Sequence, residues 1–298
     1  MAALTGVSGH RPCIDLHTHS AASDGTDPPA GLVAAARAAG VDVLAITDHD
    51  TTAGWDAAAA ALPAGMLLVR GAEFSCISPT GRAERPVSVH MLGYLFDPAH
   101  HAIVAEQSRL REERVRRLVR ITEKMAADGY PIAVEDVFAL VPPGTSAGRP
   151  HLARALVAAG VVGSVSEAFV TLLHNRSPYY VPKADTPVTT AIEMINAAGG
   201  VAVFAHPLAR RRGRVVEPSV IVDLVPAGLV GVEVDHPDHT PEDRILLRRL
   251  ATEHGLVATG SSDYHGTNKT TALCAESTPQ TALDELVGRT SGVPVLAG

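Results

Sequence analysis

Seven short runs rich in Val, Ile and Leu alternate along the chain with stretches that favour helices, and this alternation limits the fold more than any other feature of the sequence. The runs cover residues 13–16, 41–47, 66–74, 87–95, 201–205, 229–234 and 256–261. Between the first two lies a stretch, 27–40, with prolines near its start and Gly40 at its end, which is typical of a helix. The pattern predicts an α/β fold with a parallel sheet or barrel covered by helices.

The length of the chain allows this fold to carry an addition. Its 298 residues suit one large α/β domain or one domain with an insertion, and a hydrophobic content of 46% argues against disorder. From 103 to 184, helical periodicity replaces the strand-like runs. We therefore expect a barrel domain made of residues 1–102 and 185–298, interrupted by a mostly helical insertion domain of residues 103–184. A last helix is expected over 281–289.

Residues with metal-binding side chains lie in or directly after each of the seven runs. In chain order they are His17, His19, Asp24, Asp48, His49, Glu73, His90, His206, Glu233, Asp235, His236, Asp263 and His265. The carboxyl ends of barrel strands face one shared mouth, so we expect these side chains to converge there. Each has a structural explanation when taken alone, such as a capped turn, a core histidine or a helix cap. Their recurrence in strand order argues against seven separate coincidences.

Crowded imidazoles and carboxylates indicate metal ions, because burying such groups is costly unless cations compensate their charges and lone pairs. Mixed nitrogen and oxygen ligation suits manganese, zinc or iron, and none of the three cysteines lies among these positions. The ligands exceed the needs of one ion, so the sequence predicts two or three divalent ions per chain. We expect manganese, with zinc and iron as alternatives. Clustered ions can activate water and clamp both ends of an ester that is being cleaved.

Six motifs in order, "DLHTHSAASDGT", "AITDHDT", "GAEFS", "HMLGY", "AHP" and "GSSDYHG", resemble the PHP (polymerase and histidinol phosphatase) family of metal-dependent phosphoesterases. The resemblance covers nearly the whole chain and implies a distorted (β/α)7 barrel with a trinuclear metal site. Within the family, "GRPH" ahead of a helix in the insertion and "GVEVDHPDH" later in the chain are similar to a bacterial subgroup. That subgroup hydrolyses 3',5'-nucleotide bisphosphates and short RNA oligonucleotides.

The same resemblance implies which residues hold each ion. The first ion is expected between His17, His19, Glu73 and Asp263, the second between Glu73, His90 and His206, and the third between Asp24, His49 and His265. Glu73 would bridge the first two ions. No expected ligand position is substituted, which disfavours a degenerate, metal-free domain.

The implied function is hydrolysis of a 3',5'-nucleotide bisphosphate to a 5'-mononucleotide, and of short RNA from 5' to 3', by a hydroxide that bridges metal ions. No side-chain nucleophile is required. Asp48, Asp235 and His236 are candidates for assisting that hydroxide or for protonating the leaving group. Asp15 and Asp48 have the alternative role of orienting metal ligands from behind.

A second phosphate would need its own anchors. Arg149 and His151 open a predicted helix, where a guanidinium and free amides favour an anion, and Lys183 is a further candidate. The structural alternative for Arg149 is a salt bridge that pins the insertion to the barrel. The basic runs 109–120 and 210–214 are expected as a solvated helix face and a surface loop, the second with the alternative of bordering the mouth.

Three other functions stay open at this point. One is a phosphatase of another small ester, of which histidinol phosphate is the family example. Another is a non-catalytic accessory module that binds a nucleotide or a polymerase, which the intact ligand set disfavours. The third is hydrolysis of a C–N bond by the same metals.

Charge and cysteine content limit partners and location. A net charge of -7 argues against binding along nucleic acid by a basic surface, and we expect no sequence-specific DNA binding. The first 13 residues hold no apolar leader-like segment, and no apolar run reaches the roughly 18 residues of a membrane-spanning helix. Three cysteines without a C-x-x-C pair argue against a disulfide framework. These features predict a cytoplasmic protein without membrane contact; protein partners and oligomeric state stay unassigned.

Overall fold

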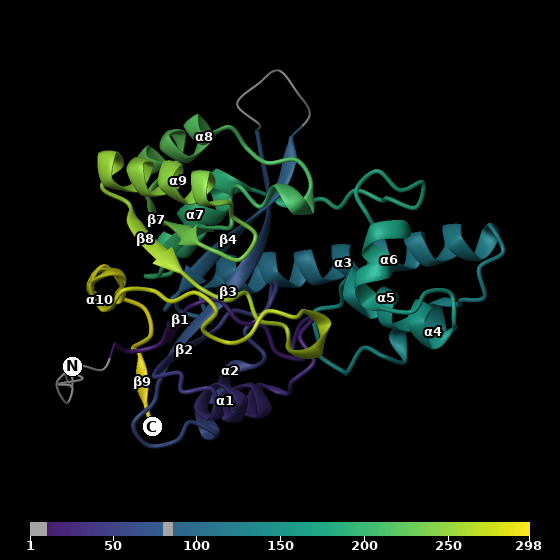
Figure 1. Cartoon of the computed structure of the whole chain (residues 1–298), viewed down its shortest axis with the longest axis horizontal. Coiled ribbons are helices and arrows are strands. Elements are labelled where there is room, and N and C mark those ends of the chain that lie inside the picture. The colour runs from purple at the N-terminus through teal and green to yellow at the C-terminus, as the bar shows by residue number, and fades with distance from the viewer. Residues whose placement is uncertain (1–10, 80–85) are drawn as a thin grey trace.

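The computed structural model describes residues 11–79 and 86–298, and its centre is a strongly curled sheet (Figure 1). Residues 1–10, to which part of the expectation about a leader applied, lie outside the described residues. The sheet has the strand order β1 (Ile14–Asp15), β2 (Val43–Ile46), β3 (Leu67–Ser78), β4 (Val87–Tyr94), β6 (Val201–Ala205), β7 (Leu229–Asp235) and β8 (Val257–Gly260). Two short strands, β5 (Thr186–Pro187) and β9 (Leu296–Ala297), pair with β3. Each of the seven apolar runs coincides with one of the main strands, although β3 continues to Ser78 and β7 to Asp235, beyond the ends of their runs.

Strand β4 runs antiparallel to both of its neighbours, β3 and β6, whereas the other pairs along the main path of the sheet are parallel. The expectation of a wholly parallel arrangement is therefore wrong at this strand. Residues 79–86 join β3 to β4, and so short a connection favours a hairpin, because a parallel pair needs a crossover of a dozen residues or more. As a result, the first half of β4 lies at the same end of the sheet as the carboxyl ends of the other strands.

The two edges of the sheet meet just beyond the ends of β1 and β8. Thr18 and Tyr264 form an isolated parallel bridge, and the amide of His19 donates to the carbonyl of Tyr264 at 2.8 Å. The Tyr94 hydroxyl also donates to the Leu16 carbonyl at 2.8 Å. These contacts close the sheet into the expected distorted barrel.

Both faces of the sheet are buried, which explains why the strands read as continuous apolar runs. In β2, Val43 and Ala45 belong to one hydrophobic cluster with Ile14, whereas Leu44 and Ile46 belong to another that packs beneath the helices. Successive residues of a strand point to opposite faces, so one short run supplies both clusters.

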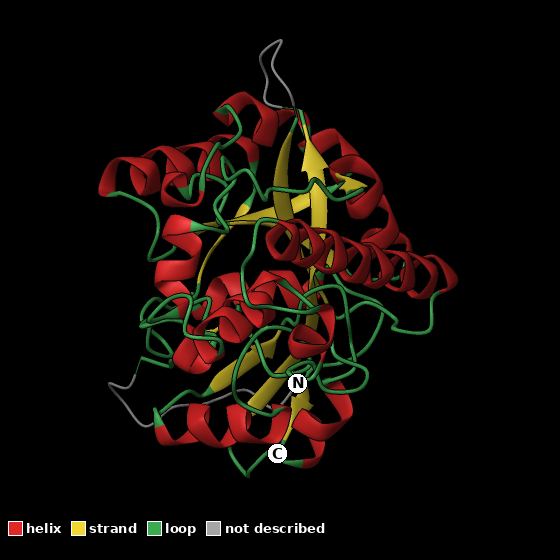
Figure 2. Cartoon of the chain, turned by 90° about the vertical axis from the view of Figure 1, so that its right-hand side faces the viewer, coloured by secondary structure: helices red, strands yellow, loops and turns green. Residues whose placement is uncertain are grey.

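Helices cover the outside of the barrel (Figure 2). They are α1 (Pro29–Ala38), α2 (Trp55–Ala60), α7 (Val188–Ala197), α8 (Pro218–Asp223), α9 (Pro241–His254) and α10 (Gln280–Gly288). Helix α1 begins at Pro29 and is followed by Gly40 at φ +79°, a conformation that glycine adopts without a steric cost, as the 27–40 stretch predicted. Helix α10 lies where a last helix was expected.

Four helices between β4 and β5 project to one side of the barrel (Figure 1). They are α3 (His101–Ala127), α4 (Val134–Phe138), α5 (Arg149–Ala158) and α6 (Val165–Thr171). Among themselves they bury a third hydrophobic cluster, which includes Leu118, Met125, Leu152 and Leu156. The division at residues 102/103 and 184/185 stays a prediction. Within the described ranges, no helix combines the length and the apolar character that crossing a membrane requires.

Cys13 and Cys274 are joined by a disulfide, and Cys76 is free and buried. The expectation that the cysteines do not pair is wrong for these two residues. They stand 261 positions apart and meet because closure of the barrel brings the segment before β1 beside the loop after β8. The predicted cytoplasmic location stays a prediction.

Candidate metal centre

The nine predicted ligands come together at the end of the barrel where six strands finish and β4 begins. His17 and His19 follow β1, and their Nε2 atoms lie 3.0 Å apart. His90 lies in the first half of β4 and pairs in register with Ser75 and Ala205. The antiparallel direction of β4 explains why its histidine lies inside a strand, whereas the others lie at strand ends.

Glu73 lies in the middle of this cluster and contacts five imidazoles from four segments. Its Oε2 lies 3.3 Å from His17 Nε2, 3.1 Å from His19 Nε2 and 3.0 Å from His49 Nδ1, and its Oε1 lies 2.7 Å from His90 Nδ1 and 3.0 Å from His206 Nε2. A carboxylate shared in this way has the position expected of a bridging ligand.

Asp24 and Asp263 supply two further carboxylates around His19. Asp24 Oδ1 lies 3.3 Å from His265 Nε2, and its Oδ2 lies 3.7 Å from His49 Nε2. Asp263 Oδ1 lies 3.4 Å from both His19 Nε2 and His265 Nδ1. Asp263 adopts φ +53°, an uncommon conformation for a residue with a side chain, which turns the backbone sharply as it leaves β8.

The surroundings raise the pKa of one histidine of the cluster and lower the pKa of two others. Burial alone lowers the pKa of His19, but hydrogen bonds to Asp263 and Glu73 outweigh burial and raise it to about 9. Burial lowers the pKa of His206 to about 3 and that of His265 to about 4, with Arg212 and Lys269 respectively adding to the effect. The carboxylates therefore need positive charge that these two imidazoles do not supply.

The donor atoms fit divalent ions, which would provide that charge. Four overlapping groups have their donor atoms within 4.8 Å of one another: His19, Asp24, His49 and His265; His17, His19 and Asp263; His17, Glu73 and His206; and His49, Glu73 and His90. Imidazole nitrogens with carboxylate oxygens suit manganese, iron or zinc. The group of His17, His19 and Asp263 contains three of the four residues expected for the first ion. The group of His19, Asp24, His49 and His265 contains all three residues expected for the third ion.

Glu233 supports the cluster from behind; its sequence position predicted that it reaches the mouth but indicated no specific role for it. Its Oε1 accepts from His17 Nδ1 at 3.2 Å, and its Oε2 accepts the His206 amide at 2.8 Å. A carboxylate in this position fixes the tautomer and ring orientation of a ligating histidine. Its place near the end of the run 229–234, among the residues expected to converge at the mouth, was the signal that pointed to it.

Asp48 and Asp235, two of the three candidates for proton transfer, are engaged elsewhere. Asp48 accepts from the Ser20 amide at 2.8 Å and from the Ser23 hydroxyl at 2.6 Å, so it holds the loop that carries Asp24. Asp235 accepts from Arg248 on α9 at 2.7 and 2.6 Å, on the outside of the barrel. These contacts favour the supporting role foreseen for Asp48 and provide no path from Asp235 to the cluster.

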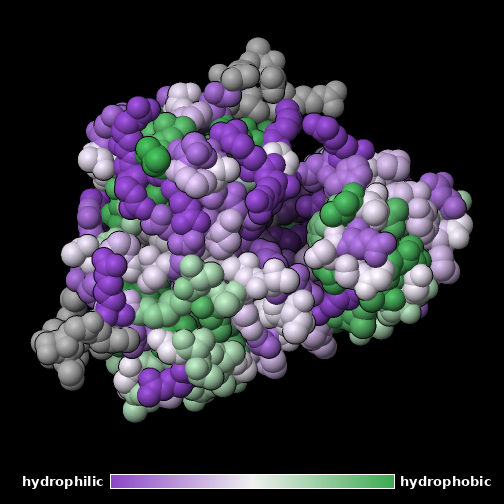
Figure 3. Space-filling view, viewed as in Figure 1, coloured by the Kyte–Doolittle hydropathy of each residue, from purple (hydrophilic) through white to green (hydrophobic). Residues whose placement is uncertain are grey.

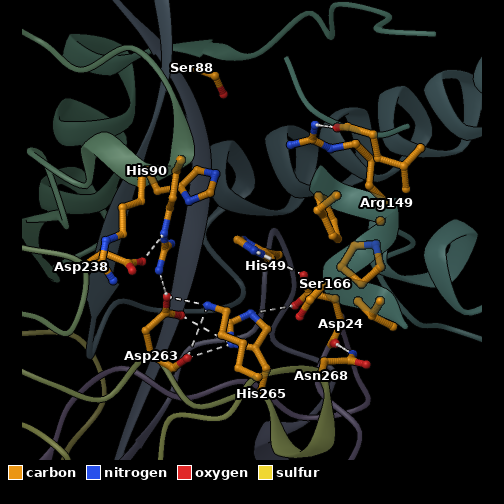
Figure 4. Close-up of a pocket in the computed structure, with 18 of the residues that line it drawn as sticks. Asp24, His49, Ser88, His90, Arg149, Ser166, Asp238, Asp263, His265 and Asn268 are labelled. Atoms are coloured by element: carbon orange, nitrogen blue, oxygen red, sulfur yellow. Dashed lines mark hydrogen bonds and ion pairs between the residues drawn. The ribbon is translucent and has the colours of Figure 1, made fainter. Parts of the chain in front are cut away.

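A cavity of about 680 Å³ opens over the cluster, between the barrel and the helical insertion. In Figure 3 it is a hollow with hydrophilic walls beside the projecting helices. Figure 4 shows Asp263 and Asp238 on one side, Arg149 and Ser166 across from them, and His49 between. The third candidate for proton transfer, His236, also lines the cavity.

The predicted phosphate anchors differ in their surroundings. Arg149 lines the cavity, and its contacts are uncharged: its Nη1 donates to the Leu173 carbonyl at 2.8 Å and to Asn175 Oδ1 at 3.2 Å. Lys183 also lines the cavity but pairs with Asp185 at 2.7 Å. His151 is buried and accepts the Gly148 amide through Nδ1 at 3.1 Å, which is a helix-capping contact. The substrate roles of these residues stay predictions.

Both basic runs reach the cavity in part, which corrects the expectation of a purely solvated helix face and a surface loop. On α3, Arg114 and Arg117 line the cavity, and Arg114 Nε donates to the fully buried Asp50 at 2.5 Å. In the second run, Arg212 lines the cavity and donates to Asp263. Their neighbours conform to the expectation, because Arg116 is half-exposed and pairs along its own helix.

Comparison with known proteins agrees with this fold. The family model described as PHP domain matches residues 15–141. A 5'-3' exoribonuclease of Haemophilus influenzae is 37% identical over 252 residues, which cover 84% of this chain and 89% of the relative. A 3',5'-nucleoside bisphosphate phosphatase of Chromobacterium violaceum is 34% identical, covering 85% and 87%. A phosphoribosyl 1,2-cyclic phosphate 1,2-diphosphodiesterase of Eggerthella lenta is 34% identical, covering 85% and 94%.

A solved structure from Bifidobacterium adolescentis, described as a metal-dependent phosphoesterase, superposes with a TM-score of 0.86 at 37% identity, covering 95% of this chain and 98% of the other. Barrel, donor set and relatives together define a metal-dependent hydrolase of phosphate esters. The chain belongs to the PHP family, as the six motifs indicated.

Proposed function

We propose that this enzyme removes the 3'-phosphate from small 3',5'-nucleotide bisphosphates and, by the same chemistry, shortens 5'-phosphorylated RNA oligonucleotides from the 5' end. The proposal includes three manganese ions held as the sequence motifs imply, and a cytoplasmic location. The relatives from H. influenzae and C. violaceum are named for these two activities. The E. lenta relative makes a cyclic phosphodiester the second candidate substrate.

One observation carries the choice of a substrate with two phosphates: the insertion presents two arginines to the cavity whose contacts are uncharged. Arg149 stacks on Phe169 at 5.5 Å, and Arg117 stacks on Tyr180 at 5.5 Å. Arg117 Nε has no hydrogen-bond partner among the residues that the structure describes. Burial, with Arg117 nearby, lowers the pKa of Arg149 to about 9, as expected of cations that lack an anion. A phosphate across the cavity from the metal centre would supply that anion.

Divalent ions supply Lewis-acid activation of water and of the phosphate, so the chain needs no side-chain nucleophile. The chain's own part is to hold the ions and to place the ester. Glu73 is shared between the proposed first and second ions, and Glu233 orients His17 from behind. The insertion sets how far Arg149 and Arg117 lie from the metal centre across the cavity.

In this proposal His236 donates a hydrogen bond to the leaving oxygen. Its Nδ1 accepts the Asp238 amide at 3.0 Å, so in the neutral ring the proton is on Nε2. Nε2 lies 3.4 Å from Asp263 Oδ2, beside the metal centre. That N–H can donate a hydrogen bond to the oxygen that leaves when the ester bond breaks, and water supplies the proton, because a neutral ring that lost its Nε2 proton would become an imidazolate.

The test compares adenosine 3',5'-bisphosphate with 3'-AMP as substrates, in the presence of manganese, for the wild type and for Arg149→Met. Losing a hydrogen-bonded charge contact of about 1.5–3 kcal/mol should lower kcat/KM for the bisphosphate roughly 10- to 150-fold. The value for 3'-AMP, which has no second phosphate to bind, should hardly change. Arg120→Met, an exposed residue of α3, removes a charge from the insertion away from the cavity and serves as the control.

Equal losses on both substrates would refute the second-phosphate site and leave the phosphoesterase centre standing. Cleavage of 1,2-cyclic phosphoribose in preference to the bisphosphate would favour the second candidate. A purified protein that carries its metals and cleaves no phosphate ester would revive the accessory-module hypothesis.

A further inference from the structure

Two cations from separate loops meet on one oxygen of Asp263, and the proposed function gives neither of them a task. Arg212 ends the short helix η1 (Arg210–Arg212) after β6, and Lys269 follows the short helix η3 (Gly266–Asn268) after β8. Arg212 Nη2 lies 2.5 Å from Asp263 Oδ2, and Lys269 Nζ lies 2.6 Å from the same atom. Both residues line the cavity, and about a third of each side chain is exposed, at 34% and 31%.

The two oxygens of Asp263 face different surroundings. Oδ1 points to the imidazoles, 3.5 Å from His17 Nε2 and 3.4 Å from His19 Nε2, which is the side of the proposed first ion. Oδ2 points to Arg212 and Lys269. Asp263 itself is 2% exposed and held at a positive φ, so this division is built into the backbone.

The positive charges of Arg212 and Lys269, on this wall of the cavity, are balanced only while Asp263 interacts with these two cations and with no metal ion. Arg212 Nε also donates to Asp238 Oδ2 at 2.7 Å, so two carboxylates face two cations. A metal ion on Oδ1 would take up much of the Asp263 charge, and the wall would then have positive charge to spare beside the ion. That charge lies where oxygens of a phosphate ester bound to the ions would project.

We propose that Arg212 and Lys269 form a clamp for the phosphate that is cleaved, opposite the ions and separate from the Arg117 and Arg149 wall. The inference rests on the proposed function in one respect, since it takes Asp263 as a metal ligand. The clamp binds the reacting phosphoryl group and acts on every ester that reaches the centre, whatever the rest of the substrate is. Charge-assisted contacts to phosphoryl oxygens strengthen as negative charge develops on them in the transition state.

Arg212→Gln and Lys269→Gln test the clamp, with Arg210→Gln as the matched control. Arg210 lies in the same turn, but its side chain is 55% exposed and pairs with Asp243 at 3.1 Å. Three quantities are measured for each protein: manganese bound per chain, affinity for inorganic phosphate by calorimetry with and without manganese, and kcat/KM for p-nitrophenyl phosphate. That substrate has one phosphate, so binding of a second phosphate by Arg117 and Arg149 does not affect the result.

Each of the two variants is expected to bind the wild-type amount of manganese, to bind phosphate about tenfold more weakly or worse, and to lose kcat/KM by a similar factor or more. Arg212→Lys, which keeps the charge, should recover part of the phosphate affinity. The control should match the wild type in all three measurements.

Phosphate affinity equal to that of the wild type in both variants would overturn the clamp. Loss of manganese in proportion to the loss of turnover would overturn it as well, because the two cations would then merely position Asp263. If the circular dichroism of Arg212→Gln differs from that of the wild type, Lys269→Gln decides, because among the described residues the hydrogen bonds of Lys269 Nζ go to Asp263 alone. A clamp confirmed on p-nitrophenyl phosphate, together with no preference for the bisphosphate, would refute the proposed substrate alone.

Discussion

Arg114→Met should destabilise the protein by about 3–4 kcal/mol, because it removes one partner of a buried ion pair between the insertion and the barrel. Arg114 Nε donates to Asp50 Oδ2 at 2.5 Å, and Arg114 Nη2 donates to the Ser75 hydroxyl at 2.8 Å. Burial raises the pKa of Asp50, but Arg114 and Lys183 outweigh it and hold that pKa well below the ordinary value. Asp50 is therefore an ionised carboxylate with no exposed surface.

The magnitude follows from what stays around Asp50 in the variant. Breaking a buried pair on one side costs about 3–5 kcal/mol, because the remaining charge is left without compensation. Lys183 Nζ lies 3.9 Å from Asp50 Oδ2 and the Ser75 amide still donates at 2.7 Å, so the ion-pair cost falls at the low end. The lost hydrogen bond to Ser75 adds about 1 kcal/mol at most.

The assay is urea unfolding of the metal-free protein, so that ligand binding does not enter. With a slope of about 3 kcal/mol per molar urea for a chain of this size, the midpoint should fall by about 1 M. Arg116→Met is the matched control: it lies on the same helix, is 53% exposed, and should change stability by less than about 0.5 kcal/mol. In the double variant Asp50→Asn, Arg114→Met, the loss should be smaller than the sum of the single losses. A single Arg114→Met loss below about 1 kcal/mol would show that the pair does not hold the insertion to the barrel.

Two further predictions concern residues close to the metal centre and in the insertion. Glu233→Gln should lower manganese affinity roughly 10- to 100-fold in a competition titration while the fold is kept, because Glu233 orients His17. The control is Asp235→Asn, two residues further along β7, where Asp235 pairs with Arg248 on the outside of the barrel. This variant should leave manganese affinity and turnover unchanged. Burial lowers the pKa of His151 to about 4. Below about pH 6.5 the imidazole therefore takes up a proton in the unfolded chain but not in the folded chain. This difference lowers the free energy of unfolding increasingly as the pH falls to about 4. His151→Gln should lessen that acid loss by up to about 3 kcal/mol in urea unfolding at pH 4 relative to pH 7.5, and an unchanged pH profile would contradict the assignment.

The sequence alone determined where the seven strands lie and which side chains gather at their ends. Strands buried on both faces must be apolar throughout, and a barrel brings the strand ends to one mouth. Local composition and chain order were therefore enough to predict that His17, Glu73 and His206 lie close together. The family followed from the same residues, because the donor set is spread over short motifs that need no knowledge of the contacts between them.

Tertiary structure decided what depends on neighbours distant in sequence. The direction of β4 follows from a short hairpin connection, and it places His90 within reach of Glu73 from the middle of a strand. The pairing of Cys13 with Cys274 requires a closed barrel. Long charged side chains are the hardest case, because their stems reach several ångströms in any direction and their partners come from other elements. Arg212 lines the cavity, whereas Asp235 pairs with Arg248 on α9, outside the barrel. The sequence positions of Arg212 and Asp235 do not show which of them faces the cavity.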